Sequence, residues 1–456
     1  MLRFLPAVTS LAIVLGHSCL SYAADFKLVV ADGGGGNGGN DWLKIVNTNP
    51  SSVLSNPGPL STFAVGTGTG TDNIEAIVFV PTSANYLTGT LFAVNENTSP
   101  NPDVGQFGTI DLSTGVFSSI GSGIGSGNGA LGIQLLDDID GLTIDPFSGI
   151  MYGTHRRGGA DTPDLLFQID RTTGSVIANA FGAGIDYVQV LPGTGNNADI
   201  DDITISSYDG QMYGVANGNG SGDTLVRIDK FTGALTTVGV MGIDDVEGLA
   251  FEGNGLMWGT TGTGGTSTTS NRIWSIDPTT GVASIPTGYD STTHQIGSPG
   301  SDFESIAGLL DAPNTISGTV FYDANINGIF DSGTENGFQG IEVRLYRDVN
   351  LDGLVDINDI LLDTKLTDVD GFYEWIVLAT GAFVLNIDIT GIPLGDGLTT
   401  DNIELANFGT SFGLSDPNNN FGFVPEPSTY LLCLALSSLG AGAFYRRRRL
   451  KKTAAA

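Results

Sequence analysis

Cysteine is almost absent from this chain of 456 residues, which contains two, Cys19 and Cys433. The residues between them carry no thiol. Disulfides therefore cannot stabilise the main part of the chain, and catalysis by a cysteine nucleophile is excluded there. Histidine is nearly as rare, because only His155 and His294 lie in this part. Two histidines exclude a zinc site built from several imidazoles.

Basic residues are also scarce, with 18 Lys and Arg against 49 Asp and Glu. Seven of the basic residues lie in the two terminal segments, and so does Glu426. Residues 25–424 therefore contain 11 basic and 48 acidic residues, a formal charge of −37. Such a surface repels nucleic acid and attracts divalent cations, so we expect no nucleic-acid partner.

The N-terminal segment, residues 1–24, reads as a secretory signal peptide. Arg3 precedes an apolar core that runs to Leu15, and small residues follow at Ala23 and Ala24. This order is typical of a segment that is removed on export. We therefore expect residues 25–424 to fold outside the cell.

The C-terminal segment, residues 425–452, combines three features in a fixed order. Pro425, Glu426 and Pro427 come first, and an apolar run ending at Tyr445 follows. A basic cluster closes the segment: Arg446, Arg447, Arg448 and Arg449. The apolar run Thr429–Tyr445 has 17 residues, the lower limit for a transmembrane helix. The prolines disfavour helix before the run, and the cations favour the cytoplasmic side.

This tail resembles the PEP-CTERM sorting signal of bacteria that make exopolysaccharide. The resemblance implies recognition by an exosortase-type sorting protease at the membrane, with cleavage near Pro425–Pro427. It also implies a secreted protein that is anchored transiently in the membrane and then reaches the envelope or the extracellular matrix.

Residues 25–312 contain a repeated pattern of short apolar runs separated by Gly, Thr and Asp. Each copy begins with an acid inside an apolar run, and the five acids are spaced by 65, 61, 46 and 57 residues: Glu75, Asp140, Asp201, Glu247 and Glu304. Three further strands follow in most copies, the third ending in Ile-Asp before a turn that closes at glycine. The fourth strand is expected at segments such as Ser175–Ala178. Four strands repeated radially indicate a β-propeller.

The blade count follows from the incomplete copy. Phe303–Leu309 has no later strands of its own, whereas Lys27–Ala31, Trp42–Val46 and Ser61–Val65 lack a first strand. We therefore predict an all-β protein with a five-bladed propeller, whose last blade is completed by both ends of the segment. Closure would remove exposed sheet edges. An open pair of β-sandwiches is the alternative.

Residues 313–424 change character and predict a small β-sandwich of alternating apolar residues. The landmarks are Ile316–Asp323, Gly340–Tyr346, Thr367–Tyr373 and Asn420–Phe423. They resemble the B-type repeat domain of serine-aspartate-repeat surface proteins. The resemblance implies an immunoglobulin-like sandwich loaded with calcium, which here would form a stalk.

Two loops of this segment have the spacing of calcium loops, with calcium as the expected cofactor. In the first, oxygen donors are expected at positions 1, 3, 5, 7, 9 and 12: Asp348, Asn350, Asp352, the carbonyl of Leu354, Asp356 and Asp359. An Asp instead of Glu at position 12 makes bidentate closure less certain. The second loop has fewer charges and a displaced acid: Asp323, Asn325, Asn327, Asp331 and Glu335. Ordinary acidic turns are the alternative for both.

The five repeated acids have two interpretations. Carboxylates gathered near a propeller axis repel one another unless they are protonated, hydrogen-bonded or bridged by a cation. A central metal is one hypothesis. The other, which we favour, is that each acid accepts backbone N–H bonds from a neighbouring blade, because repeats duplicate their packing residues.

These features favour a non-enzymatic surface protein. The propeller would bind a polysaccharide or a surface protein, and the sandwich would join it to the envelope. A secreted metal-dependent enzyme acting on polysaccharide or a phosphate ester is the alternative, and it requires ring acids that face an open cleft.

Overall fold

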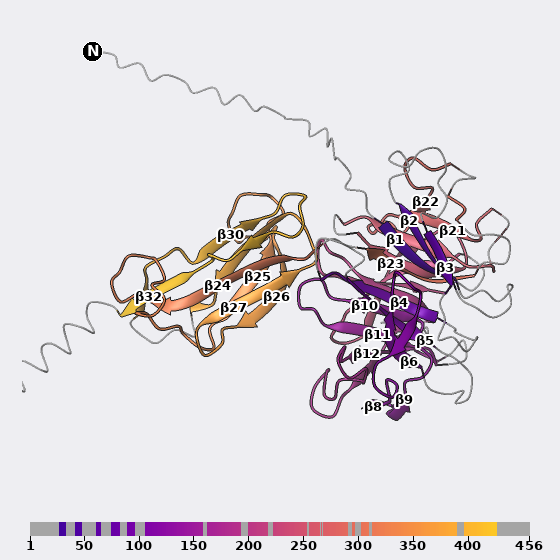
Figure 1. Cartoon of the computed structure of the whole chain (residues 1–456), viewed down its shortest axis with the longest axis horizontal. Helices are drawn as coiled ribbons and strands as arrows, with labels where there is room; N and C mark the ends of the chain where they lie inside the picture. Colours follow the sequence, from indigo (N-terminus) through magenta and orange to yellow (C-terminus); the bar gives the residue numbers. More distant parts are fainter. Residues whose placement is uncertain are drawn as a thin grey trace, which may run out of the picture.

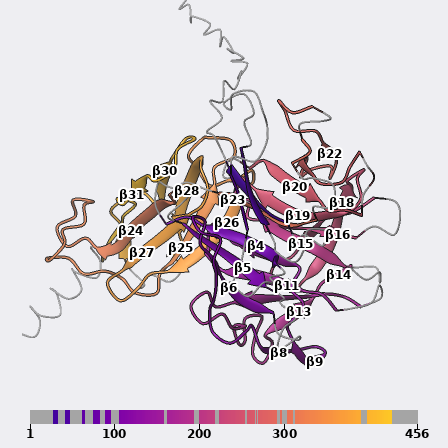
Figure 2. The same cartoon turned by 45° about the vertical axis from the view of Figure 1, so that its right-hand side comes forward.

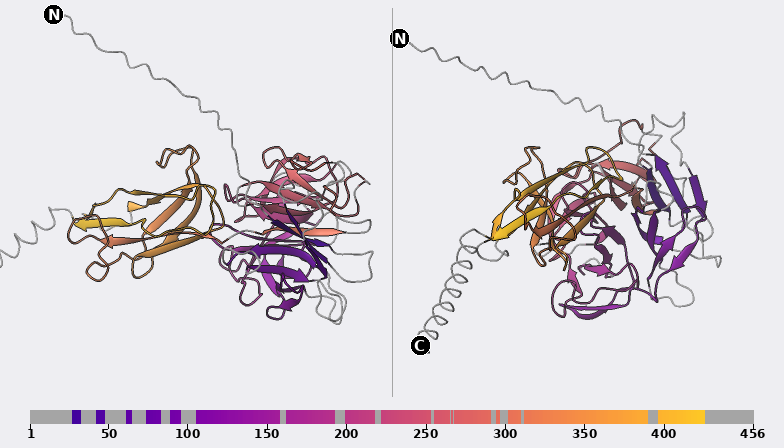
Figure 3. Two further views of the ribbon diagram at one scale, coloured as in Figure 1. Left: turned by 45° about the horizontal axis from the view of Figure 1, so that its top comes forward. Right: turned by 60° about the vertical axis from the view of Figure 1, so that its left-hand side comes forward.

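The computed structural model describes residues 27–32, 42–47, 61–64, 74–82, 89–95, 105–157, 162–192, 199–217, 222–252, 255–264, 266, 268–290, 294–296, 302–309, 312–389 and 396–425. These residues form strands and turns and contain no α-helix. Two units lie side by side (Figures 1 and 3): a ring of sheets from residues 27–309 and a pair of sheets from residues 312–425. We call them the sheet ring and the sheet pair.

Among its described residues, the sheet ring contains five antiparallel sheets of four strands each, one of them extended by the short strand β14. From the centre outward, the first sheet consists of β4 (Ile74–Val80), β5 (Thr90–Asn95), β6 (Gln106–Ile110) and β7 (Phe117–Ser119), and the second of β10 (Gly141–Ile144), β11 (Met151–His155), β12 (Leu165–Ile169) and β13 (Tyr187–Gln189). The third consists of β15 (Ile200–Ile205), β16 (Met212–Ala216), β17 (Thr224–Ile228) and β18 (Ala234–Val240), with β14 (Leu191–Pro192) beside β18. The fourth consists of β19 (Val246–Phe251), β20 (Met257–Thr261), β21 (Arg272–Ile276) and β22 (Ala283–Ser284).

The fifth sheet joins the two ends of the ring. Its strands are β23 (Phe303–Leu309), β1 (Lys27–Asp32), β2 (Trp42–Asn47) and β3 (Ser61–Ala64). β1 pairs with β23 from Lys27 opposite Leu309 to Asp32 opposite Phe303. The repeat pattern predicts this pairing, and it ties the first described strand of the chain to the last strand of the ring.

The first strands of the five sheets surround one axis. β4 contacts β10, β10 contacts β15, β15 contacts β19, β19 contacts β23, and β23 contacts β4. Every residue of β10 and β15 is buried, because these strands have neighbours on both faces. Figure 2 shows the sheets arranged around this centre.

The turn between the third and fourth strands repeats as the sequence predicts. Asp111 and Asp170 accept hydrogen bonds from the backbone amides two residues later, at 2.7 and 2.8 Å. Gly115 and Gly174 end these turns at φ values of 74° and 72°, where a side chain would be strained. The predicted fourth strand at Ser175–Ala178 is wrong, because this segment makes only an isolated bridge, and β13 takes its place.

The sheet pair consists of two sheets with one shared apolar core, including Trp375, Val343 and Phe421. One sheet has the order β27 (Phe372–Val377), β24 (Asn314–Tyr322), β32 (Phe421–Pro425) and β29 (Asp396–Leu398), with β31 (Ser415–Asp416) also beside β24. The other has the order β26 (Ile360–Leu366), β25 (Glu342–Arg347), β28 (Ala382–Ile387) and β30 (Ile403–Asn407). A separate hairpin of β8 (Ser126–Gly129) and β9 (Gly132–Leu135) belongs to the sheet ring.

Candidate functional site

The five repeated acids all lie at the start of a central strand. Glu75, Asp201, Glu247 and Glu304 are the second residues of β4, β15, β19 and β23, and Asp140 immediately precedes β10. A second acid stands two residues earlier in four of the copies: Asp138, Asp199, Asp245 and Asp302. We call these nine acids the acidic mouth. The recurring Asp-x-acid pattern is visible in the sequence, but only the second acid of each pair is predicted from it as a site residue.

Burial and mutual repulsion raise the pKa values of four mouth acids, Glu75, Asp140, Asp201 and Glu247. Burial raises the pKa of Glu75 to about 7, with further contributions from the charges of Asp138 and Asp302. Burial, followed by the charges of Asp245 and Asp302, raises the pKa of Glu247 to about 8. The pKa values of Asp140 and Asp201 also lie well above their usual range, mainly because of burial. Glu75 and Glu247 therefore hold protons near neutral pH.

Arg156 supplies positive charge to this mouth. Its guanidinium lies 3.8 Å from a carboxylate oxygen of Asp140 and 3.5 Å from one of Asp199. Burial acts to lower its pKa, but the charges of the surrounding acids raise it above the usual value. Arg156 also lowers the pKa of Glu75 and Glu247. This half-exposed cation thus partly compensates acids that would otherwise repel one another.

Asp202, the residue after the predicted ring acid Asp201, occupies the axis itself. Its side chain is 0% exposed, and its carboxylate accepts hydrogen bonds from the amide of Leu249 on β19 (2.9 Å) and the hydroxyl of Ser305 on β23 (3.3 Å). The backbone amide of Leu142 on β10 also stabilises the charged form of this carboxylate. Ser305 in turn accepts a bond from the amide of Ile77 on β4, at 3.2 Å. These two side chains therefore connect all five central strands.

Two other acids link neighbouring sheets through backbone amides. Asp164 accepts a bond from the amide of Ile200 on the next sheet, and Asp223 accepts one from Val246, both at 2.7 Å. This is the type of bond that we proposed for the ring acids. Here, however, the acceptors are not the repeated acids but Asp164 and Asp223, which immediately precede β12 and β17, the third strands of their sheets.

Beyond Asp202 lies a small cavity of about 60 Å³, lined by the central strands and by Leu378 of the sheet pair. The sheet pair docks at this end. The backbone amide of Leu378 bonds to the carbonyl of Pro146 at 2.9 Å, and Phe147 enters the core of the sheet pair. The mouth acids lie at the starts of the central strands, and these contacts come after β10 has ended. The mouth therefore faces away from the sheet pair.

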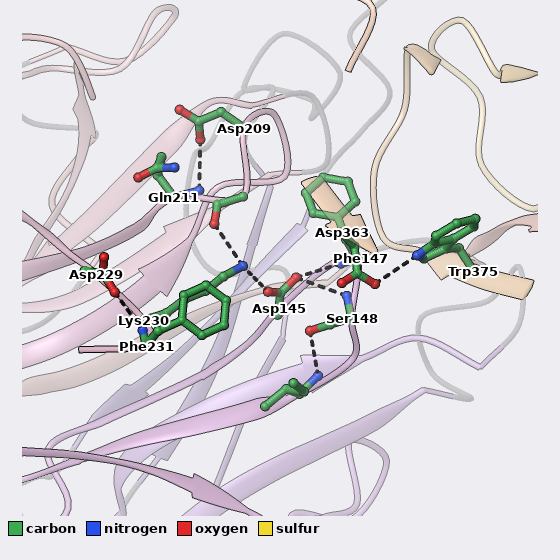
Figure 4. A network of polar contacts seen from close by, with 12 residues as sticks. Asp145, Phe147, Ser148, Asp209, Gln211, Asp229, Lys230, Phe231, Asp363 and Trp375 are labelled. Carbon is green, nitrogen blue, oxygen red and sulfur yellow. Dashed lines mark hydrogen bonds and ion pairs between the residues drawn. The ribbon is translucent and has the colours of Figure 1, made fainter. Parts of the chain in front are cut away.

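A polar network borders the same junction (Figure 4). Lys230 forms an ion pair with Asp145, which is almost fully buried, and Asp145 also accepts a bond from the amide of Phe147 at 2.9 Å. On the sheet-pair side, the indole of Trp375 donates to Asp363 at 2.9 Å. Burial raises the pKa of Asp363 despite that bond.

The first calcium-type loop, Asp348–Asp359, joins β25 to β26. Its backbone has positive φ at Leu351 (59°) and Gly353 (72°), so the chain curls tightly after position 1. One oxygen of Asp348 accepts a bond from the amide of Gly353 at 3.1 Å. The other oxygen is buried and has no hydrogen-bond donor, although Asp348 is only 6% exposed. A buried carboxylate oxygen without a donor is costly unless a cation approaches it.

The second loop, which follows β24, has the same geometry. Ile326 and Gly328 have φ values of 60° and 71°, and Asp323 accepts a bond from the amide of Gly328 at 2.8 Å. Burial acts to raise the pKa of Asp323, but the hydrogen bonds to its carboxylate outweigh it and lower the pKa.

The closing acids of the two loops are equivalent despite their different spacing. The two oxygens of Asp359 accept bonds from the amides of Val349 (3.2 Å) and Asp356 (2.9 Å). Those of Glu335 accept bonds from the amides of Ala324 and Asp331, both at 2.9 Å. In each loop the acid thus bonds to positions 2 and 9. The longer Glu335 compensates for a displacement of one residue.

The remaining predicted donors face one another within each loop. Asn350 donates to Asp352 (2.9 Å) and Asp356 (3.3 Å). Asn325 and Asn327 donate to Asp331, at 2.7 and 3.2 Å. Across the described ranges, no three His, Cys, Asp or Glu side chains converge as a metal-binding group. Calcium in either loop would therefore also need amide and backbone oxygens, which are ligands that it accepts.

Residues 423–449 match the PEP-CTERM protein-sorting motif. The chain therefore carries the signal of a protein that is secreted, recognised by an exosortase-type sorting protease and sorted to the envelope. The match begins within β32, whose last residue is Pro425. Glu426, Pro427 and the arginines lie outside the described residues, as does the apolar run Thr429–Tyr445. No helix long and apolar enough to cross a membrane occurs in the described part of the chain.

Other similarities are partial. The chain is 39% identical over 103 residues to colossin-B of Dictyostelium discoideum, and this stretch is 22% of the chain and 3% of colossin-B. Among solved structures, TolB of Acinetobacter baumannii is similar at 14% identity and a TM-score of 0.33, covering 62% of the chain and 66% of TolB. The Dos1 propeller has 13% identity and a TM-score of 0.28, covering 60% of each chain. The shaft pilin SpaA of Lactobacillus rhamnosus has 9% identity and a TM-score of 0.19, covering 25% of the chain and 51% of the pilin.

Proposed function

We propose that this protein is a non-enzymatic component of the cell envelope or extracellular matrix. The sheet ring is a five-bladed β-propeller that binds a polysaccharide or a surface protein. The sheet pair is an immunoglobulin-like sandwich that holds calcium in its two loops and acts as a stiff stalk. The sorting signal directs this assembly to the envelope and anchors it in the membrane until the signal is cut.

The closed axis carries the proposal. Asp202 and Ser305 connect the central strands, and beyond them only a small cavity of about 60 Å³ remains, which Leu378 borders. A substrate cannot enter from the stalk side. The acidic mouth is the polar face opposite to the stalk, which suits a head that presents one surface to a partner.

Two observations support calcium in the loops: their set of oxygen ligands and the environment of Asp348. The buried oxygen of Asp348 has no donor, and the cation would supply the missing positive charge. Asp348 and Asp323 would hold the ion at position 1, with Asn350, Asp352, Asp356 and Asp359 in one loop and Asn325, Asn327, Asp331 and Glu335 in the other. Because the unfolded chain lacks this arrangement, bound calcium stabilises the fold.

Binding by the propeller can be tested with residues 25–425, on a glycan array and on immobilised exopolysaccharide. We expect retention that weakens when Glu75 and Glu247 are both changed to Gln. The exposed turn residue Asp229 is the control, and Asp229→Asn should bind as the wild type does. If the protein is retained on no glycan and by no surface protein, the proposed binding role is wrong.

A metal-dependent hydrolase is the second candidate, and the pKa values of Glu75 and Glu247 favour it. Carboxyl groups that titrate near pH 7 and 8 are suited to general acid–base catalysis. Hydrolysis of a polysaccharide or a phosphate ester that is lost in Glu247→Gln would support it. Wild-type protein without hydrolysis in the presence of divalent metals would exclude it.

A further inference from the structure

Arg347 connects the two units of the molecule. It is the last residue of β25 and only 4% exposed. Its guanidinium donates to the backbone carbonyls of Ser207 (2.9 Å) and Tyr208 (3.0 Å) in the sheet ring and of Thr380 (2.6 Å) in the sheet pair. It also lies over the rings of Phe383, at 4.3 Å, and Tyr208, at 5.3 Å.

No carboxylate forms an ion pair with Arg347 within the described residues. Burial lowers its pKa to about 10, so the guanidinium stays charged at neutral pH. A buried charge that is held by carbonyl oxygens depends on accurate placement of those oxygens. The contact between the two units is therefore sensitive to small movements of the end of β25.

The next residue, Asp348, is position 1 of the first calcium-type loop. A cavity of about 260 Å³ lies between this loop and the sheet ring, bordered by Ser207 and Tyr208 on one side and by Asp348, Val349 and Leu351 on the other. The loop thus borders the junction, and the donor-free oxygen of Asp348 is one residue from the side chain that bonds to the ring.

The second loop is remote from this junction. β24 begins at Asn314, opposite Val377 and next to the docked residue Leu378, and it runs to Tyr322. Asp323 therefore follows the far end of a nine-residue strand. The chain contains two loops of the same type, one at the junction and one away from it, and the second serves as an internal control.

We propose that calcium bound by the Asp348–Asp359 loop strengthens the attachment of the sheet ring to the sheet pair, with Arg347 as the connecting residue. The inference rests on the proposed calcium binding and adds that calcium regulates the contact between the two units. A cation that bonds to Asp348 fixes the end of β25 and hence the guanidinium that bonds to Ser207 and Tyr208. Without calcium the end of β25 is free to shift, and the junction loosens.

Because docking and calcium binding are linked equilibria, their coupling can be measured as a change in calcium affinity. If calcium favours docking, docking favours calcium by the same factor. Removing a contact that the sheet ring makes with Arg347 should therefore weaken calcium binding by a loop in the sheet pair. Tyr208→Ala is the informative variant, because it removes the aromatic ring under the guanidinium, and Tyr208 belongs to the sheet ring and supplies no calcium ligand. Arg347→Met removes the connecting side chain itself.

Site-resolved hydrogen exchange of residues 25–425 during a calcium titration is the test. The readout is the calcium concentration that half-protects the amides of residues 349–358, with residues 324–330 as the internal control. Tyr208→Ala and Arg347→Met should raise this concentration by about 5-fold or more for the first loop only. Arg344→Met, which loses bonds to Glu342 and Asp388 within the sheet pair, and the exposed ring variant Phe231→Ala should leave it unchanged.

The outcomes separate the two proposals. If the first loop of Tyr208→Ala and Arg347→Met is half-protected at the same calcium concentration as in the wild type, the coupling is wrong and calcium binding still stands. Equal weakening of both loops would also overturn it, because the substitutions would then act on the whole sheet pair. Wild-type protein with no calcium protection in either loop would overturn calcium binding, and the coupling with it.

Discussion

The carboxylate of Asp202 on β15 accepts a hydrogen bond from the backbone amide of Leu249 on β19, 2.9 Å away in a neighbouring sheet. The same side chain contacts Ser305 on β23. A single buried acid thus fixes strands that are 47 and 103 residues away along the sequence. Fully buried acids are unfavourable unless such bonds satisfy them, and burial raises the pKa of Asp202 well above its usual range.

Asp202→Ala should strongly destabilise the sheet ring. The substitution leaves buried amides such as that of Leu249 without an acceptor, and each costs about 1–3 kcal/mol. We expect a loss of roughly 2 kcal/mol or more in the free energy of unfolding, measured by chemical denaturation. Asp202→Asn, which retains one acceptor oxygen, should lose less. Asp229→Ala in an exposed turn should cost under about 1 kcal/mol, and an equal loss in both alanine variants would contradict a special role for Asp202.

The stability of the ring should fall as the pH rises. Glu75 and Glu247 have folded pKa values of about 7 and 8, against 4.5 as the ordinary value. Because the folded state holds these protons more tightly, their stabilisation is complete below about pH 4.5 and is lost as the pH passes 7 and 8. Glu75→Gln/Glu247→Gln should flatten this dependence and be more stable than the wild type at pH 8 by about 2 kcal/mol or more. A parallel pH dependence in both proteins would contradict the raised pKa values.

Arg156→Met should destabilise the ring most at high pH. The guanidinium pairs with Asp140 and Asp199, and its removal leaves the repulsion within the mouth unopposed once Glu75 and Glu247 ionise. We expect about 1 kcal/mol of destabilisation at pH 8 and a smaller effect at pH 5, since the side chain is partly exposed and the pairs are screened. The measurement is thermal unfolding at both pH values, with Arg157→Met as the control. A loss independent of pH would indicate a packing role instead.

Local sequence signals predict the repeating part of the fold well. The Asp-x-x-x-Gly turns form as expected because their bonds join residues two apart, and these signals do not depend on tertiary contacts. The pairing of β1 with β23 also follows from counting the strands of an incomplete repeat. The strand expected at Ser175–Ala178 is wrong because outer strands have few packing constraints, so a later segment, Tyr187–Gln189, pairs with β12 instead.

The contacts that join distant elements could not be predicted in the same way. Asp202 looks like a duplicate of its neighbour Asp201 until the axis brings Leu249 and Ser305 beside it. One signal was present, because the corresponding positions in the other copies hold small residues, Ala76, Gly141, Gly248 and Ser305. Arg347 had no such signal, since its partners are backbone carbonyls of another unit. The two calcium-type loops could be predicted because all the expected ligands of each loop lie within one short segment.

Because the proposed stability of the sheet pair and of the junction both rest on calcium, thermal unfolding of residues 25–425 with calcium and with a chelator is the most direct measurement. A free calcium concentration about a hundred times the dissociation constant stabilises each loop by about 2.7 kcal/mol. For a unit the size of the sheet pair, this predicts a melting temperature about 10 °C or more above that in chelator. Asp348→Asn should reduce the shift, and Asp368→Asn in an exposed turn should not. An identical melting temperature of the sheet pair in calcium and in chelator would contradict calcium binding.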